Sequence, residues 1–192
     1  MRENLDFAFF GMFEAQNGPW VVLGDLNYSD LSASRGAPLG ANFADAEVNT
    51  ALTIASAFGG YAVVDRPDLR IEAGGGLRFY DMSVDTRLVG NAGVPNLDFP
   101  RSESWVDVIV GVNQRAPIAA RWFARGQADV GGFGLGDGSE LSWQVYLGGG
   151  YVLNETWSIE AGYRHLSIEK NLDRADVTFE QSGPLIGVTA RF

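Results

Sequence analysis

The residues with the most reactive side chains lie close together near the C-terminal end of the chain. His165 and Ser167 are two residues apart, so on a β-strand both side chains would project from the same face. Glu169 continues that face, and Glu180 would approach from a neighbouring strand. A histidine beside a serine is the arrangement in which an imidazole activates a hydroxyl nucleophile. The other interpretation, which we prefer, is a histidine making ordinary polar contacts beside Tyr163, and we then assign no catalytic residue.

The elements that would position these residues are β-strands, because side chains alternate in character with a period of two. From Leu141 to Leu147, for example, Leu, Trp and Val alternate with Ser, Gln and Tyr. Most of these segments exceed the usual strand length of about five or six residues, and helix is at most incidental. The sequence therefore predicts an all-β fold of nine strands, at residues 4–15, 19–30, 44–63, 69–85, 102–114, 119–131, 139–153, 157–170 and 175–192.

The connections between the predicted strands alternate between short turns and long loops. The short turns are expected at residues 16–18, 65–68, 114–117 and 154–156, and the strongest signal is the Asn17-Gly18 pair. The long loops are expected at residues 31–43, 86–101, 132–138 and 171–174. Short turns at one rim and long loops at the other are typical of an antiparallel transmembrane β-barrel.

An internal repeat supports two similar hairpins. Gly59-Gly60-Tyr61 is followed by a turn and then by Ile71-Glu72-Ala73-Gly74. Gly149-Gly150-Tyr151 is likewise followed by a turn and then by Ile159-Glu160-Ala161-Gly162. Glycines at 74–76 and 148–150 are expected to relieve crowding or to permit bends in these strands.

Composition excludes several classes of function. The chain has 192 residues, which suits one domain over residues 1–192, and it carries 24 acidic against 14 basic residues, a net charge of -10. This balance argues against nucleic acid as a partner. The absence of cysteine and the single histidine argue against disulfide scaffolds and zinc sites, so we predict no metal and no cofactor. The aspartates of the loops are interpreted as solvated charge.

The two faces of the strands differ in a way that suits a membrane barrel, in which apolar faces meet lipid and polar faces line the interior. Val48, Leu52, Ile54 and Phe58 form one such apolar face. Charges of both signs occupy the face that we assign to the interior: Arg70, Glu72, Arg78, Asp107, Arg121, Arg125, Asp129, Glu160 and Arg164. Aromatic residues near the strand ends are assigned to the membrane interfaces: Trp20, Tyr28, Trp122, Tyr151, Trp157 and Tyr163.

The last strand, Leu185-Ile186-Gly187-Val188-Thr189-Ala190-Arg191-Phe192, ends on an aromatic residue after alternating apolar positions. In this the sequence resembles the small outer-membrane β-barrel proteins of Gram-negative bacteria, in the broad OmpA-like or porin-like sense. The resemblance implies that Phe192 is the signal read by the barrel-assembly machinery. It also implies a monomer in the bacterial outer membrane, with the lipid bilayer and lipopolysaccharide as partners.

The number of strands raises a question of closure. With nine strands, the first and the last run in the same direction and can close only through a parallel seam, whereas single-chain bacterial barrels have even strand numbers. We therefore expect one further N-terminal strand, together with the export signal, to be missing from this chain, which would give about ten strands. The alternative is that one strand has been split or two merged.

Three functional hypotheses remain. The first is a non-enzymatic integral outer-membrane barrel, structural or narrowly porin-like, whose interior is largely closed by salt bridges, since small barrels are filled by side chains. The second is a lipid-modifying hydrolase, because His165-Leu166-Ser167 resembles the His-x-Ser motif of outer-membrane lipid A deacylases, although Ile168 stands where that family has asparagine. The third is a soluble β-barrel that binds an apolar ligand.

Overall fold

Nine β-strands make up nearly all of the chain described by the computed structural model, which covers residues 2–36, 43–91, 93–172 and 175–191. The predicted all-β class and the nine predicted strands are confirmed. The strands are β1 (Arg2–Asn17), β2 (Trp20–Gly36), β3 (Phe43–Arg66), β4 (Leu69–Gly90), β5 (Leu97–Pro117), β6 (Trp122–Gly132), β7 (Leu141–Val152), β8 (Trp157–Leu172) and β9 (Ala175–Arg191).

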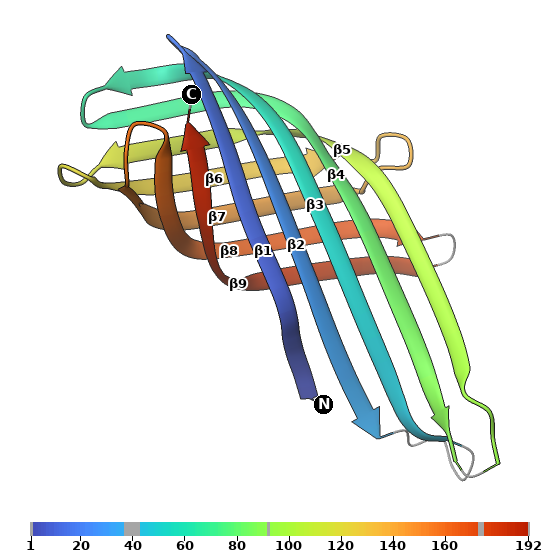
Figure 1. The fold of residues 1–192 in the computed structure, drawn as a ribbon. Helices are drawn as coiled ribbons and strands as arrows, with labels where there is room; N and C mark the ends of the chain where they lie inside the picture. The colour runs from blue at the N-terminus through green and yellow to red at the C-terminus, as the bar shows by residue number, and fades with distance from the viewer. Residues whose placement is uncertain (1, 37–42, 92, 173–174, 192) are drawn as a thin grey trace. The chain divides into compact units, whose positions relative to one another are not determined.

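The sheet closes on itself in sequence order, from β1 round to β9 (Figure 1). From β5 to β9 each strand pairs antiparallel with the next. β1 and β9 instead run parallel, with partners from Gly11–Val188 to Glu14–Arg191. The parallel seam that nine strands require is therefore made directly, and the described residues close the ring without the tenth strand that we expected.

The chain divides into two compact units, which are described separately. Unit 1 comprises residues 1–9, 27–54 and 80–104, and its described strand residues come from β1 to β5. Unit 2 comprises residues 10–26, 55–79 and 105–192 and includes part of every strand. The parallel seam and the pairings from β5 to β9 all lie within unit 2. The expectation of a single domain stays a prediction.

The short turns follow from local chemistry. Gly18 has a φ of 58°, the left-handed conformation that an Asn-Gly hairpin turn needs. At the β7–β8 turn the side chain of Asn154 accepts hydrogen bonds from the backbone N–H groups of Thr156 and Trp157, at 2.9 and 2.8 Å, as turn asparagines commonly do. The turn predicted at 114–117 is wrong, because β5 continues to Pro117 and the reversal follows it.

Two of the predicted long loops are shortened because the strands beside them extend further than expected. β4 continues to Gly90 and β5 begins at Leu97, so the connection predicted at 86–101 is mostly strand. β2 likewise extends to Gly36, into the segment predicted as loop, and residues 37–42 lie outside the described residues. The β6–β7 loop, after Gly132 and before Leu141, is close to the prediction.

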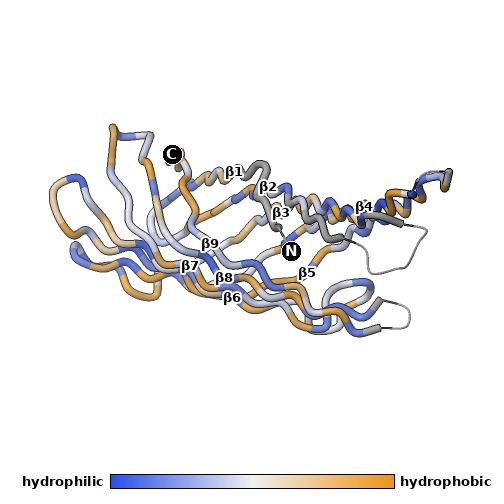
Figure 2. Tube along the Cα trace, turned by 90° about the horizontal axis from the view of Figure 1, so that it is seen from below, coloured by the Kyte–Doolittle hydropathy of each residue, from blue (hydrophilic) through white to orange (hydrophobic). Residues whose placement is uncertain are grey.

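Hydrophobic and hydrophilic residues alternate along most strands, as the tube coloured by hydropathy shows (Figure 2). The predicted outward face of β3 is the exception: Leu52, Ile54 and Phe58 are buried, and the intervening Thr53 and Ala55 are not. In the middle of β3 the alternate positions, from Ala51 to Ala57, hold small residues, while Asp45 and Glu47 lie on the same face nearer the start of the strand and are exposed. The middle of the strand therefore offers no charged side chain to the interior, and its large apolar side chains are buried instead.

Candidate functional site

The charged residues predicted for the interior are, with one exception, at least half-buried. Arg70 is half-buried, and the fully buried members are Glu72, Arg78, Asp107, Arg125, Asp129, Glu160 and Arg164. Arg121 requires a correction: it is exposed and lies in the turn before β6, where its carbonyl accepts a hydrogen bond from the Val152 N–H. Because the turn falls later than predicted, Arg121 lies outside the strand alternation that would turn it inward.

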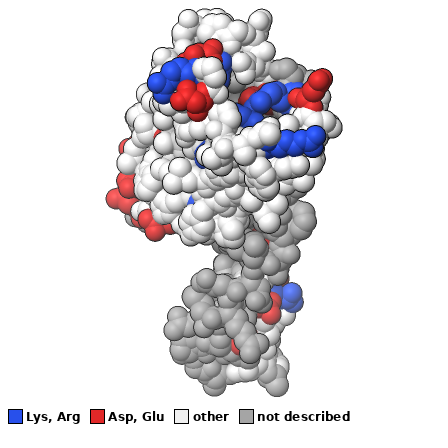
Figure 3. Space-filling view, turned by 90° about the vertical axis from the view of Figure 1, so that its left-hand side faces the viewer, with Lys and Arg blue, Asp and Glu red and all other residues white. Residues whose placement is uncertain are grey.

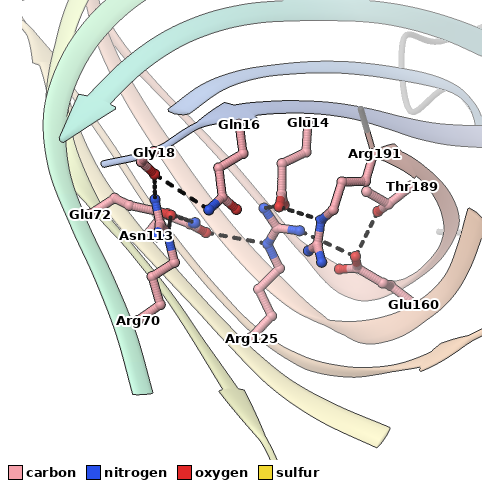
Figure 4. Close-up of polar contacts among 10 residues, drawn as sticks. All are labelled: Glu14, Gln16, Gly18, Arg70, Glu72, Asn113, Arg125, Glu160, Thr189 and Arg191. Atoms are coloured by element: carbon pink, nitrogen blue, oxygen red, sulfur yellow. Dashed lines mark hydrogen bonds and ion pairs between the residues drawn. The ribbon is translucent and has the colours of Figure 1, made fainter. Parts of the chain in front are cut away.

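One network joins strands from both sides of the parallel seam (Figure 4). The Arg125 guanidinium lies 3.2 Å from a carboxylate oxygen of Glu14 and 3.2 Å from one of Glu160. Arg191 Nε donates to Glu14 at 2.7 Å, and Thr189 Oγ1 donates to Glu160 at 2.6 Å. β1, β6, β8 and β9 are therefore tied together inside the ring.

The same network continues onto β4 and β5. The Asn113 amide donates to Glu72 at 2.5 Å and accepts from Arg125 Nε at 3.3 Å. Arg70 binds Glu72 at 2.6 Å and the more exposed Asp65 at 3.0 Å. Ion pairs and hydrogen bonds thus run across the interior from β4 to β9.

A second network is centred on Arg78 and Asp129. The Arg78 guanidinium donates to both carboxylate oxygens of Asp129, at 2.8 and 2.9 Å, and to Ser56 Oγ at 3.0 Å. The Gln144 amide also donates to Asp129, at 2.7 Å. The side chains of Arg78 and Asp129 are only 0% and 2% exposed. This bidentate geometry is the strong form of an arginine–carboxylate pair.

A third network anchors the β6–β7 loop. Asp107 accepts from the backbone N–H of Ser139 at 2.7 Å and from Ser142 Oγ at 2.8 Å. Trp105 Nε1 donates to Ser139 Oγ at 2.9 Å, and Lys170 Nζ lies 4.6 Å from the centroid of the Trp105 ring. The loop is therefore fixed to the buried side chains of β5.

Little space remains around Asp25 and Arg164. A cavity lined by Asp25, Gln127, Gln144, Tyr146 and Arg164, among others, has a volume of about 10 Å³, which is room for about one water molecule. An apolar cluster of Val21, Leu23, Phe58 and Ile109 is also buried. Two larger cavities, of about 290 and 450 Å³, have mostly polar linings, the first beside Asp30 and Asp85 and the second beside Glu140 and Lys170.

The outward positions of the same strands are apolar and exposed. Figure 3 faces the side on which the β5–β6 and β7–β8 turns lie, where the charged atoms gather toward the top and the left-hand edge and uncharged atoms cover most of the rest. Exposed outward residues of β5 to β9 include Val106, Val108, Val110, Val112, Trp143, Val145, Leu147, Ile159, Ile186 and Val188.

The predicted interface aromatics fall into two groups. Trp20, Trp122 and Trp157 are exposed at the first residues of β2, β6 and β8, all at the short-turn end. Trp20 and Trp122 make edge-to-face contacts with Tyr61 and Tyr151, each with ring centroids 4.9 Å apart.

The remaining predicted aromatics lie elsewhere. Tyr28 is half-buried in unit 1, and Tyr163 is exposed within β8. Phe192, the predicted assembly signal, lies outside the described residues.

The structure does not assemble the predicted His165–Ser167 pair. His165 Nδ1 shares a hydrogen bond of 2.5 Å with Ser182 Oγ on β9, and its ring lies 4.7 Å from that of Trp143. Ser167 is buried and sits opposite Glu180 in the β8–β9 register. The two residues share a strand face, as predicted, but the nearest hydroxyl partner comes from the adjacent strand.

The sequence interpretation missed several interior residues. Glu14 and Arg191 pair across the seam, and Asn113, Gln144 and Arg115 also point inward by the alternation of their strands. The signal for Glu14 was present, since it follows the outward Phe13 in the alternating pattern. The pairing of Glu14 with Arg191 was not visible, because it depends on how the ring closes.

No group of three or more His, Cys, Asp or Glu side chains suited to a metal ion occurs among the described residues. The described part of the chain also has no helix long and apolar enough to cross a membrane. Comparison with protein-family models, with curated proteins and with solved structures finds no match for this chain.

Proposed function

We propose that this protein is an integral β-barrel of the bacterial outer membrane. The observation that carries the proposal is the orientation of the side chains: valine, leucine and tryptophan are exposed on the outside, and arginine–carboxylate pairs are buried inside. Water-soluble barrels have the opposite arrangement, and a hydrocarbon surround favours this one. Three exposed tryptophans at the short-turn end support an interfacial belt there.

The interior favours a closed barrel over a porin. The ion pairs cross the ring, and the small cavity beside Asp25 and Arg164 has room for only about one water molecule. We therefore propose a structural role in the membrane, with no enzymatic activity. A soluble barrel that binds an apolar ligand is less well supported, because such a ligand needs an apolar cavity of several hundred Å³, and the two cavities of about 290 and 450 Å³ are lined mainly by polar and charged residues.

The partners in this proposal are the bilayer, lipopolysaccharide and, through β9, the assembly machinery. Ile186 and Val188 are exposed on the outward face of β9 and suit contact with lipid. The protein is proposed to act as a monomer.

Tryptophan quenching by brominated lipids tests the membrane location. Two variants each retain one tryptophan, either the outward Trp143 or the buried Trp105, with phenylalanine at the other four tryptophan positions. In vesicles of brominated phosphatidylcholine, we expect strong quenching of Trp143 and weak quenching of Trp105. Equal, weak quenching of both, with full folding in plain buffer, would contradict the proposal.

Planar-bilayer recording tests the closed interior separately. We expect the folded protein to insert without stepwise conductance. Reproducible single-channel steps from the wild-type protein would instead support the narrow-porin alternative while leaving the membrane location intact.

A further inference from the structure

Arg115 lies inside the ring and has no ion pair with a carboxylate among the described residues, unlike Arg78, Arg125 and Arg191. Arg115 lies near the end of β5, directly opposite Arg125 in the β5–β6 register. Its guanidinium carbon is 3.2 Å from the centroid of the Phe123 ring, which holds the flat face of the group by a cation–π contact. The aromatic ring fixes the position of the charge but accepts no hydrogen bond in the guanidinium plane.

The neighbouring carboxylates are already engaged. Glu14 binds Arg125 and Arg191, and one oxygen of Glu160 binds Arg125 and Thr189. Arg115 Nη1 is buried and has no hydrogen-bond partner among the described residues, and Glu160 Oε2 is the buried acceptor in the same state. Glu14 and Glu160 are therefore taken up by Arg125, Arg191 and Thr189, and no ion pair of Arg115 occurs among the described residues.

An unpaired buried donor on a charged group is costly, and such a group often marks the place of an ion or an ordered water. A water molecule could bridge Arg115 to Glu160 Oε2, but it would leave the Arg115 guanidinium without an ion pair. An anion would satisfy the donor and supply the ion pair together. Arginine suits this role because its planar donors match the oxygens of phosphate and carboxylate groups.

We propose that Arg115, together with Arg191, binds a small soluble oxyanion, a phosphate or a carboxylate, at the short-turn end of the ring. The side chain of Arg191 is 34% exposed, which gives solvent access to the cluster. Both arginines alternate with outward residues and so face the interior, which favours a soluble anion over a lipid headgroup. This inference does not depend on the membrane location proposed above.

The test is thermal unfolding of the full chain in detergent micelles, followed by tryptophan emission, with inorganic phosphate or acetate replacing chloride at constant ionic strength. A ligand at roughly five times its dissociation constant should raise the midpoint by about 2–4 °C for a chain of this size. We expect this increase for the wild type and its loss in Arg115→Gln. The control is Arg121→Gln, which removes an exposed arginine from the adjacent turn and should keep the full increase.

Three results would overturn the proposal: no anion-dependent shift in the wild type, an equal shift in Arg115→Gln, or a shift lost equally in Arg121→Gln. The unfolding midpoint of the wild type could also rise only in micelles doped with phosphatidylglycerol and not with inorganic phosphate. In that case the anion bound by Arg115 is a lipid headgroup, and the proposal of a soluble anion is contradicted. If Arg115→Gln fails to fold, Arg115→Lys replaces it in the test, because lysine keeps the charge but lacks the planar donors. A smaller anion-dependent increase of the midpoint in Arg115→Lys supports the site, and an increase equal to that of the wild type contradicts the proposal.

Discussion

Arg78 and Asp129 show how a single buried pair holds the interior of the ring. Both side chains are almost fully buried, and the two hydrogen bonds between them are supplemented by Ser56 and Gln144. A buried pair of this kind adds little net stability compared with an apolar pair, but removing one partner leaves an uncompensated charge. The pair therefore fixes which strands face each other more than it raises overall stability.

Asp129→Ala should lower the free energy of unfolding by about 3–5 kcal/mol, because Arg78 would lose both carboxylate oxygens in a buried setting. The measurement is urea unfolding of the folded protein in detergent micelles. The matched control is Asp68→Ala, which removes an exposed partner of Arg66 at 3.6 Å and should cost less than about 1 kcal/mol. Equal effects of the two substitutions would contradict the account of the interior.

Gly74 marks a place where two strands approach too closely for a side chain. A Cβ atom there would collide with the backbone carbonyl oxygen of Gly59 on β3, whereas one on Gly183 of β9 would meet nothing within 4 Å. We expect Gly74→Ala to cost about 1–3 kcal/mol by overpacking, and Gly183→Ala to be tolerated. Urea unfolding of the two variants checks this, and tolerance of both would show that β3 and β4 can move apart.

The sequence predicts the interior residues well where alternation is strict. In β4 and β8, charged residues separated by outward aromatic or aliphatic ones lie inside, as expected for Arg78 and Glu160. The prediction fails for Arg121, since a shift of the turn removes a residue from the alternation. The sequence also gives no indication that Ser182 is the partner of His165, because a contact between strands depends on their register, which one strand's sequence does not contain.

At the scale of whole strands, the nine predicted segments are all present, but their ends differ. The turn predicted at 114–117 includes Pro117, yet Pro117 is the last residue of β5, a position at which a proline is tolerated. β4 and β5 extend into a segment whose Gly, Asn and Pro residues indicate a loop. Loop-like composition shows roughly where a connection lies, but the residue at which a strand ends depends on how far it pairs with its neighbour.

The parallel pairing of β1 with β9 is the most unusual element of the fold, and the absence of native cysteine makes it easy to test. Phe13 and Ala190 are direct partners in the seam. We expect Phe13→Cys/Ala190→Cys to form an intramolecular disulfide on mild oxidation, visible as a mobility shift on non-reducing electrophoresis.

The offset pair Phe13→Cys/Val188→Cys is the control and should react poorly. A strand inserted between β1 and β9 would separate the first pair by about 10 Å, two strand spacings, beyond the limit of about 7 Å for a disulfide. Failure of Phe13→Cys/Ala190→Cys to cross-link in the folded protein would therefore restore the ten-strand arrangement.

At the scale of the whole molecule, the central feature is the direction in which the apolar and ionic side chains of the strands point. The sequence predicts this direction for the strands on which one face carries both arginines and carboxylates, since such pairs suit an enclosed interior. It does not predict it for β3, where Leu52, Ile54 and Phe58 are buried and the alternate residues in the middle of the strand are small. Apolar residues alone do not distinguish the two faces of a strand.

The most direct test of a lipid-facing exterior is one substitution on that surface. Val112 is exposed on the outward face of β5, and Ile118 is exposed in the turn that follows. In phospholipid vesicles, Val112→Arg should lower the unfolding free energy by about 2–4 kcal/mol and Ile118→Arg by about 0–1 kcal/mol, because an arginine is costly only deep in the bilayer. If Val112→Arg changes stability by no more than about 0.5 kcal/mol, as exposed substitutions in water-soluble proteins do, the outer surface faces water and the membrane account is wrong.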